Sequence, residues 1–215
     1  ELVRQHVADG HDVLVIASTE THSAQGKLSY TKPADYIGAE GARIIRIPYR
    51  RFLPEAVMRK LRMHRGLYAL LDDFNPSVIL FHGTCGWELL TTAQYVEKNP
   101  NATFFVDSHE DQYNSARNLL SREILHIRYY GRILRIVLPT IKKILCVNLE
   151  SMNFVASMYR IPQSNLEFYP LGGRPIPDNE YWSRRSITRA AHMIKDDQIL
   201  VVQSGKQTHH RKTID

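Results

Sequence analysis

Acidic and imidazole side chains stand together directly after an apolar stretch of the chain, residues 102–106. These side chains are Asp107, His109, Glu110 and Asp111. A second apolar stretch, residues 77–81, ends in the same way with His82 and Gly83. In an open parallel sheet, ligands bind in the crevice outside the carboxyl ends of the strands. The sequence therefore predicts that these two strand ends form a reaction centre.

The same side chains offer oxygen and nitrogen donors to a metal ion. Asp107, His109 and His82 could hold zinc or manganese in a hydrolase, because carboxylates and imidazoles are ligands of both metals. The helical His-Glu-x-x-His pattern is absent, and no further metal-ligand spacing supports the three residues. A metal-dependent hydrolase therefore remains an alternative, and the main expectation is a site without a metal.

Composition indicates a globular protein without a membrane span. Of the 215 residues, 43% are hydrophobic and 23% are charged. No apolar run reaches the roughly 18 residues that would cross a bilayer. The two cysteines, Cys85 and Cys146, follow no metal or disulfide spacing, and Cys146 lies within an apolar run. Because buried free thiols are typical of a reducing compartment, the sequence favours a cytoplasmic location.

Positive charge is concentrated in two stretches of a chain whose net charge is +6. The first includes Arg59, Lys60 and Arg62, and the second includes Arg128, Arg132 and Arg135, which would share one face of a helix. Such surfaces suit anionic lipid or phosphorylated ligands. The alternatives are a solvated face and docking of the apolar part of the second helix on the core. Nucleic acid is disfavoured as a partner, because the chain shows no known binding motif.

Strand and helix patterns alternate along most of the chain. Strand patterns cover residues 12–17, 42–48, 77–81, 102–106, 144–147, 166–169 and 198–203. Helical patterns cover residues 2–9, 55–74, 85–98, about 114–141, 151–159 and about 180–194. A loop rich in Ser, Thr and Gly is expected from residue 18 to about Gly41. The alternation predicts an α/β fold with a Rossmann-like, doubly wound parallel sheet.

The composition changes near Gly172, where Gly172-Gly-Arg-Pro-Ile-Pro-Asp-Asn179 is typical of a linker. We therefore expect a Rossmann-like domain at 1–173, a linker and helix at 174–196, and the start of a second domain at 197–215. Both ends look cut, so that the first domain lacks its first strand and the second domain is incomplete. Because a site shared by two domains needs both, the segment alone is expected to be inactive.

Five features in the correct order resemble the family 4 glycosyltransferases of the GT-B fold. They are the opening helix with Gly10-His-Asp-Val13, Asp107-Ser-His109, Glu167-Phe-Tyr-Pro-Leu-Gly-Gly173, Gly205-Lys206 and Arg211-Lys212. The stretch from Asp107 to Ser115 is most similar to bacterial enzymes that build cell-surface polysaccharides. The chain departs from the family pattern in carrying Lys206 where the family has arginine, and a lysine lacks the bidentate fork. The family's glycine-rich loop and paired glutamates are not present.

The resemblance implies a retaining glycosyltransferase that moves a sugar from a nucleoside-diphosphate sugar to a hydroxyl group. The acceptor would be a saccharide or a lipid-linked saccharide, in the synthesis of cell-surface polysaccharide or glycolipid. No cofactor is implied, because the nucleotide sugar is a substrate. Peripheral contact with the inner face of the plasma membrane is expected from the basic surfaces. A nucleotide-sugar epimerase of the same fold is a further alternative.

The resemblance also implies roles for the residues on the donor side. His109 would face the donor sugar or stabilise developing charge, and Asp107 would orient it. A histidine that caps the next helix and a purely structural aspartate are the alternatives. Lys206 and Lys212, with Gly205, would bind the donor phosphates, because fixed cations stabilise a departing diphosphate. A solvated basic terminus is the alternative for these three residues.

On the acceptor side, the expected residues follow the two strand ends. His82, Gly83 and Asp111 would line the entrance for the acceptor, and the glycine would let the backbone approach a ligand closely. Glu110 is expected to be solvated.

Overall fold

The computed structural model describes residues 2–23, 27–111, 115–116, 118–119, 121–170, 172 and 176–201. Gly205, Lys206 and Lys212, which the sequence assigns to donor phosphates, lie outside the described residues. The chain divides into two compact units, residues 1–171 and residues 172–215. The strand ends with the acidic and imidazole side chains all belong to the first unit.

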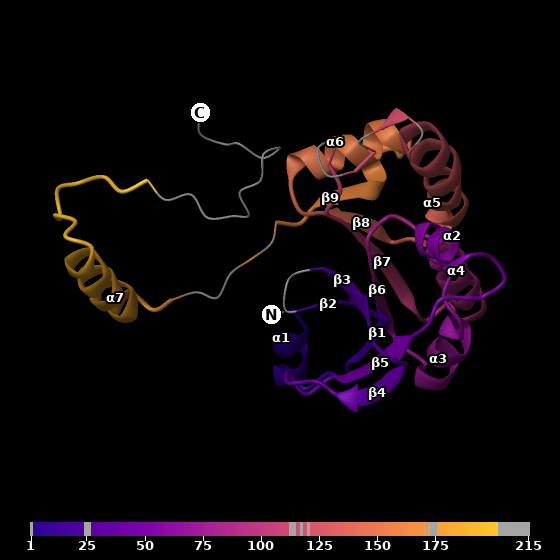
Figure 1. Ribbon diagram of the computed structural model, residues 1–215, viewed down its shortest axis with the longest axis horizontal. Helices are drawn as coiled ribbons and strands as arrows, with labels where there is room; N and C mark the ends of the chain where they lie inside the picture. The colour runs from indigo at the N-terminus through magenta and orange to yellow at the C-terminus, as the bar shows by residue number, and fades with distance from the viewer. Residues whose placement is uncertain are drawn as a thin grey trace. The chain divides into compact units, whose positions relative to one another are not determined.

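A four-stranded parallel sheet forms one half of the first unit (Figure 1). Its strands, in spatial order, are β6 (Val78–His82), β7 (Thr103–Ser108), β8 (Lys143–Cys146) and β9 (Leu166–Phe168). Among the described residues β6 is the edge of this sheet, and its Val78 and Leu80 are 61% and 41% exposed. The α/β class and the parallel sheet that the sequence predicts are confirmed.

The other half of the first unit contains both parallel and antiparallel strands. β1 (Leu14–Ser18) pairs in parallel with β5 (Arg43–Ile47), and β4 (Ala34–Ile37) pairs with β5 in the antiparallel direction. β2 (Glu20–His22) and β3 (Leu28–Tyr30) form an antiparallel pair. Within this half, the register of β1 and β5 aligns Leu14 with Arg43 and Ser18 with Ile47.

The prediction of a loop from residue 18 to Gly41 is therefore wrong, since three short strands lie there. Cross-strand pairs of side chains explain the difference. Arg43 forms an ion pair with Asp35 at 2.7 Å, and Arg46 donates a hydrogen bond to the Tyr36 hydroxyl at 3.2 Å. These pairs hold a polar strand against β5, although its sequence lacks the apolar run of a buried strand.

The described helices lie between these strands in the chain order that the sequence predicts. The α-helices are α1 (Leu2–Ala8), α2 (Glu55–Leu61), α3 (Leu67–Phe74), α4 (Glu88–Lys98), α5 (Gly131–Val137), α6 (Leu149–Met158) and α7 (Asp178–Ala191). A π-helix, η1 (Ser121–Tyr130), leads into α5, and η2 (Leu138–Thr140) and η3 (Gln163–Asn165) are 3₁₀ turns. Asn148 begins α6 as a cap, because its Oδ1 accepts the N–H of Ser151 at 2.7 Å.

The single helix predicted over residues 55–74 is interrupted. α2 ends at Leu61, and Arg62 adopts a left-handed conformation with φ of 52°. α3 begins after Gly66, whose φ is 87°. The helical periodicity of the sequence continues through residues 62–66, but the backbone is not helical there. Arg62 therefore lies at a break between two helices, and not within the single helix that the sequence predicts.

Two apolar clusters hold the first unit together. The larger lies under α4, α5 and α6 on the four-stranded sheet, where Leu89, Leu134 and Phe154 are completely buried. The smaller cluster joins β5, α3 and α4 through residues such as Ile45 and Leu71. Figure 1 shows α3, α4 and α5 along one side of the strands. Since α4 contributes to both clusters, the two halves of the first unit share a core.

The region predicted as one helix over about 114–141 changes its period at residue 131, where η1 passes into α5. Ile133, Leu134 and Val137 are buried in the larger cluster, so the apolar side of α5 docks on the core. Arg128 and Arg132 are exposed. The sequence places Arg128, Arg132 and Arg135 on one face by assuming the period of an α-helix throughout. Arg128 lies in η1, and a π-helix has more residues per turn than an α-helix, so this assumption does not hold for η1.

In the second unit, α7 forms close to the predicted helix at 180–194. The strand predicted at 198–203 is not formed in its described part, residues 198–201, where Ile199 is 93% exposed. The described residues of this unit contain no strand that could pair with it, and an apolar strand without a ladder partner leaves its backbone groups unsatisfied. None of the helices in the described part of the chain is both long and apolar enough to cross a bilayer.

Candidate functional site

The candidate site lies at the carboxyl ends of β6 and β7. The parallel register places His82, the last residue of β6, directly opposite Asp107 of β7. His109 follows two residues after Asp107, immediately beyond the strand. The pairing of the strands thus brings these three side chains together, and their role as a reaction centre stays a prediction.

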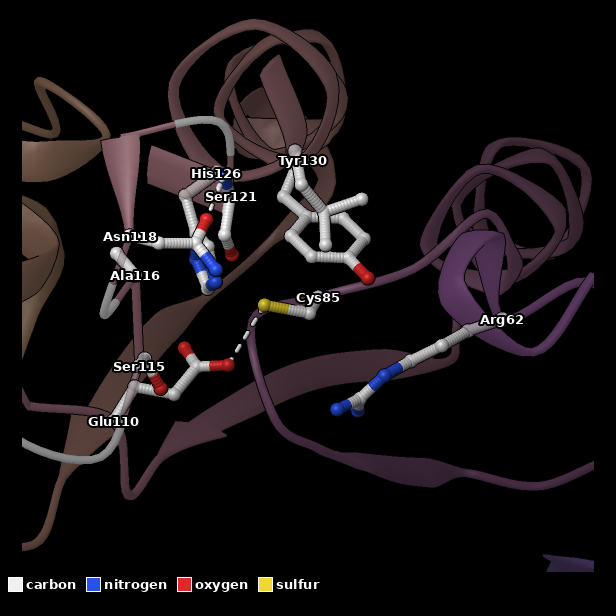
Figure 2. Close-up of a pocket in the computed structure, with 10 residues that line it drawn as sticks. Arg62, Cys85, Glu110, Ser115, Ala116, Asn118, Ser121, His126 and Tyr130 are labelled. Atoms are coloured by element: carbon white, nitrogen blue, oxygen red, sulfur yellow. Dashed lines mark hydrogen bonds between the residues drawn. The ribbon is translucent and has the colours of Figure 1, made fainter. Parts of the chain in front are cut away.

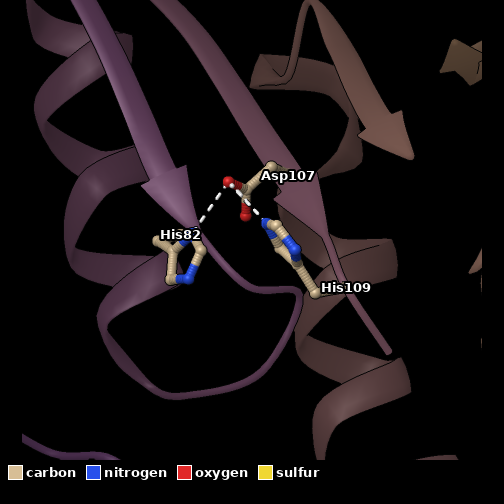
Figure 3. A group of neighbouring side chains, drawn as sticks. All are labelled: His82, Asp107 and His109. Atoms are coloured by element: carbon tan, nitrogen blue, oxygen red, sulfur yellow. Dashed lines mark hydrogen bonds and ion pairs between the residues drawn. The ribbon is translucent and has the colours of Figure 1, made fainter. Parts of the chain in front are cut away.

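Asp107 connects the two histidines (Figure 3). Its Oδ2 lies 2.8 Å from His82 Nδ1 and 3.4 Å from His109 Nε2. Its Oδ1 accepts the backbone N–H of Gly83 at 2.7 Å. The Asp107 side chain is 13% exposed, whereas the side chains of His82 and His109 are 78% and 36% exposed. A fixed carboxylate therefore presents two accessible imidazoles to solvent.

The electrostatics of this cluster favour a charged carboxylate. Burial would raise the pKa of Asp107, but hydrogen bonds from His82 and from the Gly83 N–H, with the two nearby imidazoles, lower it. The hydrogen bond to Asp107 raises the pKa of His82 against the opposite effect of burial. Asp107 thus stabilises positive charge on the neighbouring imidazole.

The loop after β6 depends on glycine at two positions. Gly83 and Gly86 have φ of 95° and 126°, which side chains with a Cβ rarely adopt. A Cβ at position 86 would lie 2.8 Å from the Cβ of Arg62. The absence of side chains there lets the break between α2 and α3 approach the loop, and it brings the Arg62 guanidinium towards Gly83.

A pocket of about 310 Å³ lies next to the cluster, between the loops after β6 and β7 and the helix η1 (Figure 2). Its lining includes Arg62, Cys85, Glu110, Asn118, His126 and Tyr130. Charged, amide, hydroxyl and aromatic groups are all represented. Such a mixture suits a ligand with several hydroxyl groups, because each hydroxyl can both donate and accept a hydrogen bond.

Glu110 is held on one wall of this pocket by two neutral donors. Its Oε1 accepts a hydrogen bond from Cys85 Sγ at 2.7 Å, and its Oε2 accepts one from the Thr84 hydroxyl. Burial raises the pKa of the Cys85 thiol, so this sulfur is a protonated donor and not a nucleophile. The expectation that Glu110 is solvated differs from this arrangement, since both carboxylate oxygens bind groups on the neighbouring loop.

Arg62 and His126 also line this pocket. Desolvation would lower the pKa of Arg62, but Cys85, Tyr130 and Glu110 raise it overall. Burial lowers the pKa of His126, and its Nδ1 lies 2.9 Å from the Tyr159 hydroxyl. Among the described residues, no hydrogen bond or ion pair within 4 Å engages the Arg62 guanidinium. The pocket therefore presents a cation and a satisfied carboxylate to a ligand.

The remaining predicted residues are distributed more widely. Asp111 is half-buried beyond β7, and its carbonyl accepts the N–H of Ser115 at 3.0 Å. Arg59 donates to the Tyr30 hydroxyl at 3.0 Å, and Lys60 is exposed on the same helix. Arg135 donates to the Tyr159 carbonyl at 2.8 Å, which ties α5 to the end of α6. Arg62, predicted for a basic surface, lines the pocket.

Sequence reasoning missed the pocket residues Cys85 and His126, and it expected Glu110 to be solvated. Cys85, and Thr84 that binds Glu110, follow the predicted His82-Gly83 at the end of a strand, so their position was a usable signal. His126 gives no such signal, because it lies in a helical stretch and reaches the pocket only through the packing of η1.

Comparison with known proteins extends this description. A sequence model for Glycosyltransferase Family 4 matches residues 1–173. The matched range includes both strand ends, the Asp107 cluster and all the pocket residues named above. A search among curated proteins found no match.

Proposed function

Because this chain belongs to glycosyltransferase family 4, we propose that the protein transfers a sugar from a nucleoside diphosphate to a hydroxyl acceptor, with retention of the anomeric configuration. The acceptor is a saccharide or a lipid-linked saccharide of a cell-surface polysaccharide or glycolipid. The observation that carries this proposal is the pairing of Asp107 with both histidines at the carboxyl edge of the sheet, beside a polar pocket.

In this proposal His109 contacts the donor sugar. Its Nε2 faces Asp107, which leaves Nδ1 as the ring nitrogen that meets a sugar hydroxyl. The Asp107 carboxylate fixes the ring and stabilises positive charge on it when charge develops on the sugar. Asp107 itself is fixed by the Gly83 N–H, so the ring orientation is determined by backbone geometry.

The acceptor occupies the pocket of Arg62, Glu110 and Asn118. The Glu110 carboxylate can accept a hydrogen bond from an acceptor hydroxyl, and the Arg62 guanidinium can donate to another oxygen. His82 and Gly83 precede the pocket residue Cys85 after β6, and His109 precedes the pocket residue Glu110 after β7. An acceptor in the pocket therefore approaches the same strand ends that hold the imidazole.

Departure of the diphosphate needs positive charge that the Asp107 cluster does not supply. Lys206 and Lys212, with Gly205 as a close backbone approach, are the groups proposed for this task, since fixed cations stabilise a departing diphosphate most directly. Residues 1–171 contain none of these three residues, so alone they are not expected to transfer sugar.

The proposal is tested by nucleotide release from a panel of nucleoside-diphosphate sugars, with the protein at its natural length and with saccharide acceptors. We expect release that depends on acceptor, and a loss of at least about tenfold in His109→Ala, the low end for a positioned acid or base. His11→Ala is the matched control, because His11 is exposed and remote from the cluster in sequence. Unchanged turnover in His109→Ala would remove this imidazole from the mechanism, and acceptor-independent formation of an altered nucleotide sugar would identify an epimerase instead.

A further inference from the structure

Two imidazole nitrogens and one carboxylate oxygen converge at the ends of β6 and β7 (Figure 3). Oδ2 of Asp107 lies 2.8 Å from His82 Nδ1 and 3.4 Å from His109 Nε2, and each of the three residues offers one donor atom within 4.8 Å of those of the other two. Zinc–nitrogen and zinc–oxygen bonds of about 2.0–2.2 Å place neighbouring donors of a tetrahedral site about 3.3 Å apart. The two distances to Oδ2 lie on either side of this value.

The carboxylate is already oriented for such a role. The Gly83 N–H binds Oδ1 of Asp107 at 2.7 Å and so directs Oδ2 towards the two rings. Partners of this kind, one step removed from the metal, fix the orientation of ligating side chains. The Asp107 side chain is 13% exposed, whereas the 78% exposure of His82 gives an ion a path from solvent.

We propose that His82, Asp107 and His109 bind a divalent transition-metal ion of the zinc class. Two imidazoles and one carboxylate suit zinc, nickel or copper, whereas magnesium and calcium prefer oxygen ligands. Three protein ligands leave coordination positions open to water. Ion binding does not depend on the proposed transferase activity.

One consequence does rest on the proposed function. An ion bound to Nε2 of His109 and to Oδ2 of Asp107 separates the ring from its carboxylate partner. Asp107 then no longer stabilises positive charge on the imidazole when charge develops on the sugar, so the bound ion is inhibitory. The same residues thus have two states, one in which Asp107 supports His109 and one in which both hold the ion.

Binding is measured by calorimetric titration of the chain with zinc chloride, without donor or acceptor. His209 and His210 are adjacent histidines that could bind zinc independently, so all titrations use a His209→Ala/His210→Ala background. We expect one zinc ion per chain and no heat with magnesium chloride. His82→Ala and His109→Ala should each weaken zinc binding at least tenfold, since loss of even a supporting partner costs about 10–100-fold. His11→Ala, the matched control, should bind as the background does.

Cobalt(II) provides a second measurement, because its visible absorption bands report the number and geometry of its ligands. The bands should appear in the background protein and change in His82→Gln and Asp107→Asn, which keep the approximate shape of the native side chains. These variants also replace any alanine variant that fails the check of folding by circular dichroism. Equal zinc affinity in the background, the His82 variants and the His109 variants would overturn the proposal, as would absence of zinc binding.

The inhibitory consequence is measured separately with the protein at its natural length. Zinc should suppress acceptor-dependent nucleotide release, and a chelator should restore it. Full activity with zinc bound would overturn the inhibitory role. A protein that binds zinc through these residues but transfers no sugar would contradict the proposed function and support the metal site.

Discussion

Asp107 shows how one residue can organise a site through its two oxygens. One oxygen accepts a backbone N–H, and the other lies within hydrogen-bonding distance of two imidazoles. Burial opposes charge on this carboxylate, and the hydrogen bonds outweigh burial. Glu110 is held in a similar way by Thr84 and Cys85, which lie on the same loop as Gly83. In both cases a strand end carries the acid and the neighbouring loop carries its donors.

His64 gives a prediction about stability at the residue scale. Its ring stacks on Tyr49 with centroids 4.4 Å apart, its Nε2 is buried without a partner among the described residues, and burial lowers its pKa to about 4. Below its ordinary pKa of 6.5 the unfolded chain binds a proton there that the folded chain does not bind until about 4. The free energy of unfolding should therefore fall on acidification through this window, by about 1–3 kcal/mol from this residue.

Urea unfolding at about pH 7 and about pH 5 measures this change. His64→Phe keeps the ring against Tyr49 and removes the proton, so it should lose less stability between the two pH values. Burial raises the pKa of Glu88, so protonation of Glu88 changes the free energy of unfolding in the opposite direction. Because Glu88 is present in both proteins, its effect cancels, and the difference between them reports His64. The same pH dependence in both proteins would show that His64 is not the titrating group.

At the scale of elements, the break between α2 and α3 determines the shape of the pocket. Arg62 ends α2 in a left-handed conformation, and its side chain packs against Gly86 of the loop after β6. The backbone N–H of Trp87, in the same loop, also donates to the Leu61 carbonyl at 3.0 Å. The end of one helix and the start of α4 are therefore fixed to each other across the pocket wall.

Gly86→Ala should destabilise this junction. The φ of 126° disfavours any Cβ, and the added carbon would lie 2.8 Å from the Arg62 Cβ, so Arg62 must move. A residue held in such a backbone region costs about 1–3 kcal/mol, which lowers the melting temperature by several degrees. Gly66→Ala is the matched control, because Gly66 also has a positive φ of 87° but nothing lies within 4 Å of its Cβ position. If both variants melt at the same temperature, contact with Arg62 contributes nothing.

The sequence predicts the elements whose signal is local. The four strands β6 to β9 and helix α4 follow apolar runs and periodicity, and the strand ends identify His82, Asp107 and His109. Strand β4 is missed because cross-strand partners stabilise it, not its own apolar pattern. The break at Arg62 and the role of Glu110 are missed for the same reason, since both depend on groups from other parts of the chain.

At the scale of the whole molecule, the net charge of +6 is unevenly distributed. Lys60 on α2, Arg128 on η1 and Arg132 on α5 are exposed, and the exposed Phe52 and Leu53 precede α2. Arg135 is exposed as well, although its guanidinium binds the carbonyl of Tyr159. The proposed contact with an anionic membrane surface rests on these exposed cations.

Cosedimentation with vesicles that contain anionic lipid tests this contact. The protein should bind at low salt and dissociate at high salt, because surface charges are screened. Lys60→Glu/Arg128→Glu/Arg132→Glu should weaken binding at least tenfold, since each cation near such a surface contributes about 1 kcal/mol. Lys27→Glu/Lys32→Glu/Lys142→Glu changes the same net charge at other exposed lysines and should bind more strongly than the first triple variant. No binding of the unmodified protein at low salt would exclude the membrane contact.

The open edge of β6 has a practical consequence for the molecule. Val78 and Leu80 stand exposed on a strand that, among the described residues, has a neighbour on one side only. Unpaired backbone groups flanked by β-branched and aliphatic side chains are a template on which a strand of another molecule can be added. Concentrated solutions of this chain should therefore aggregate through β6, and a lysine in place of Val78 is the simplest way to keep it dispersed.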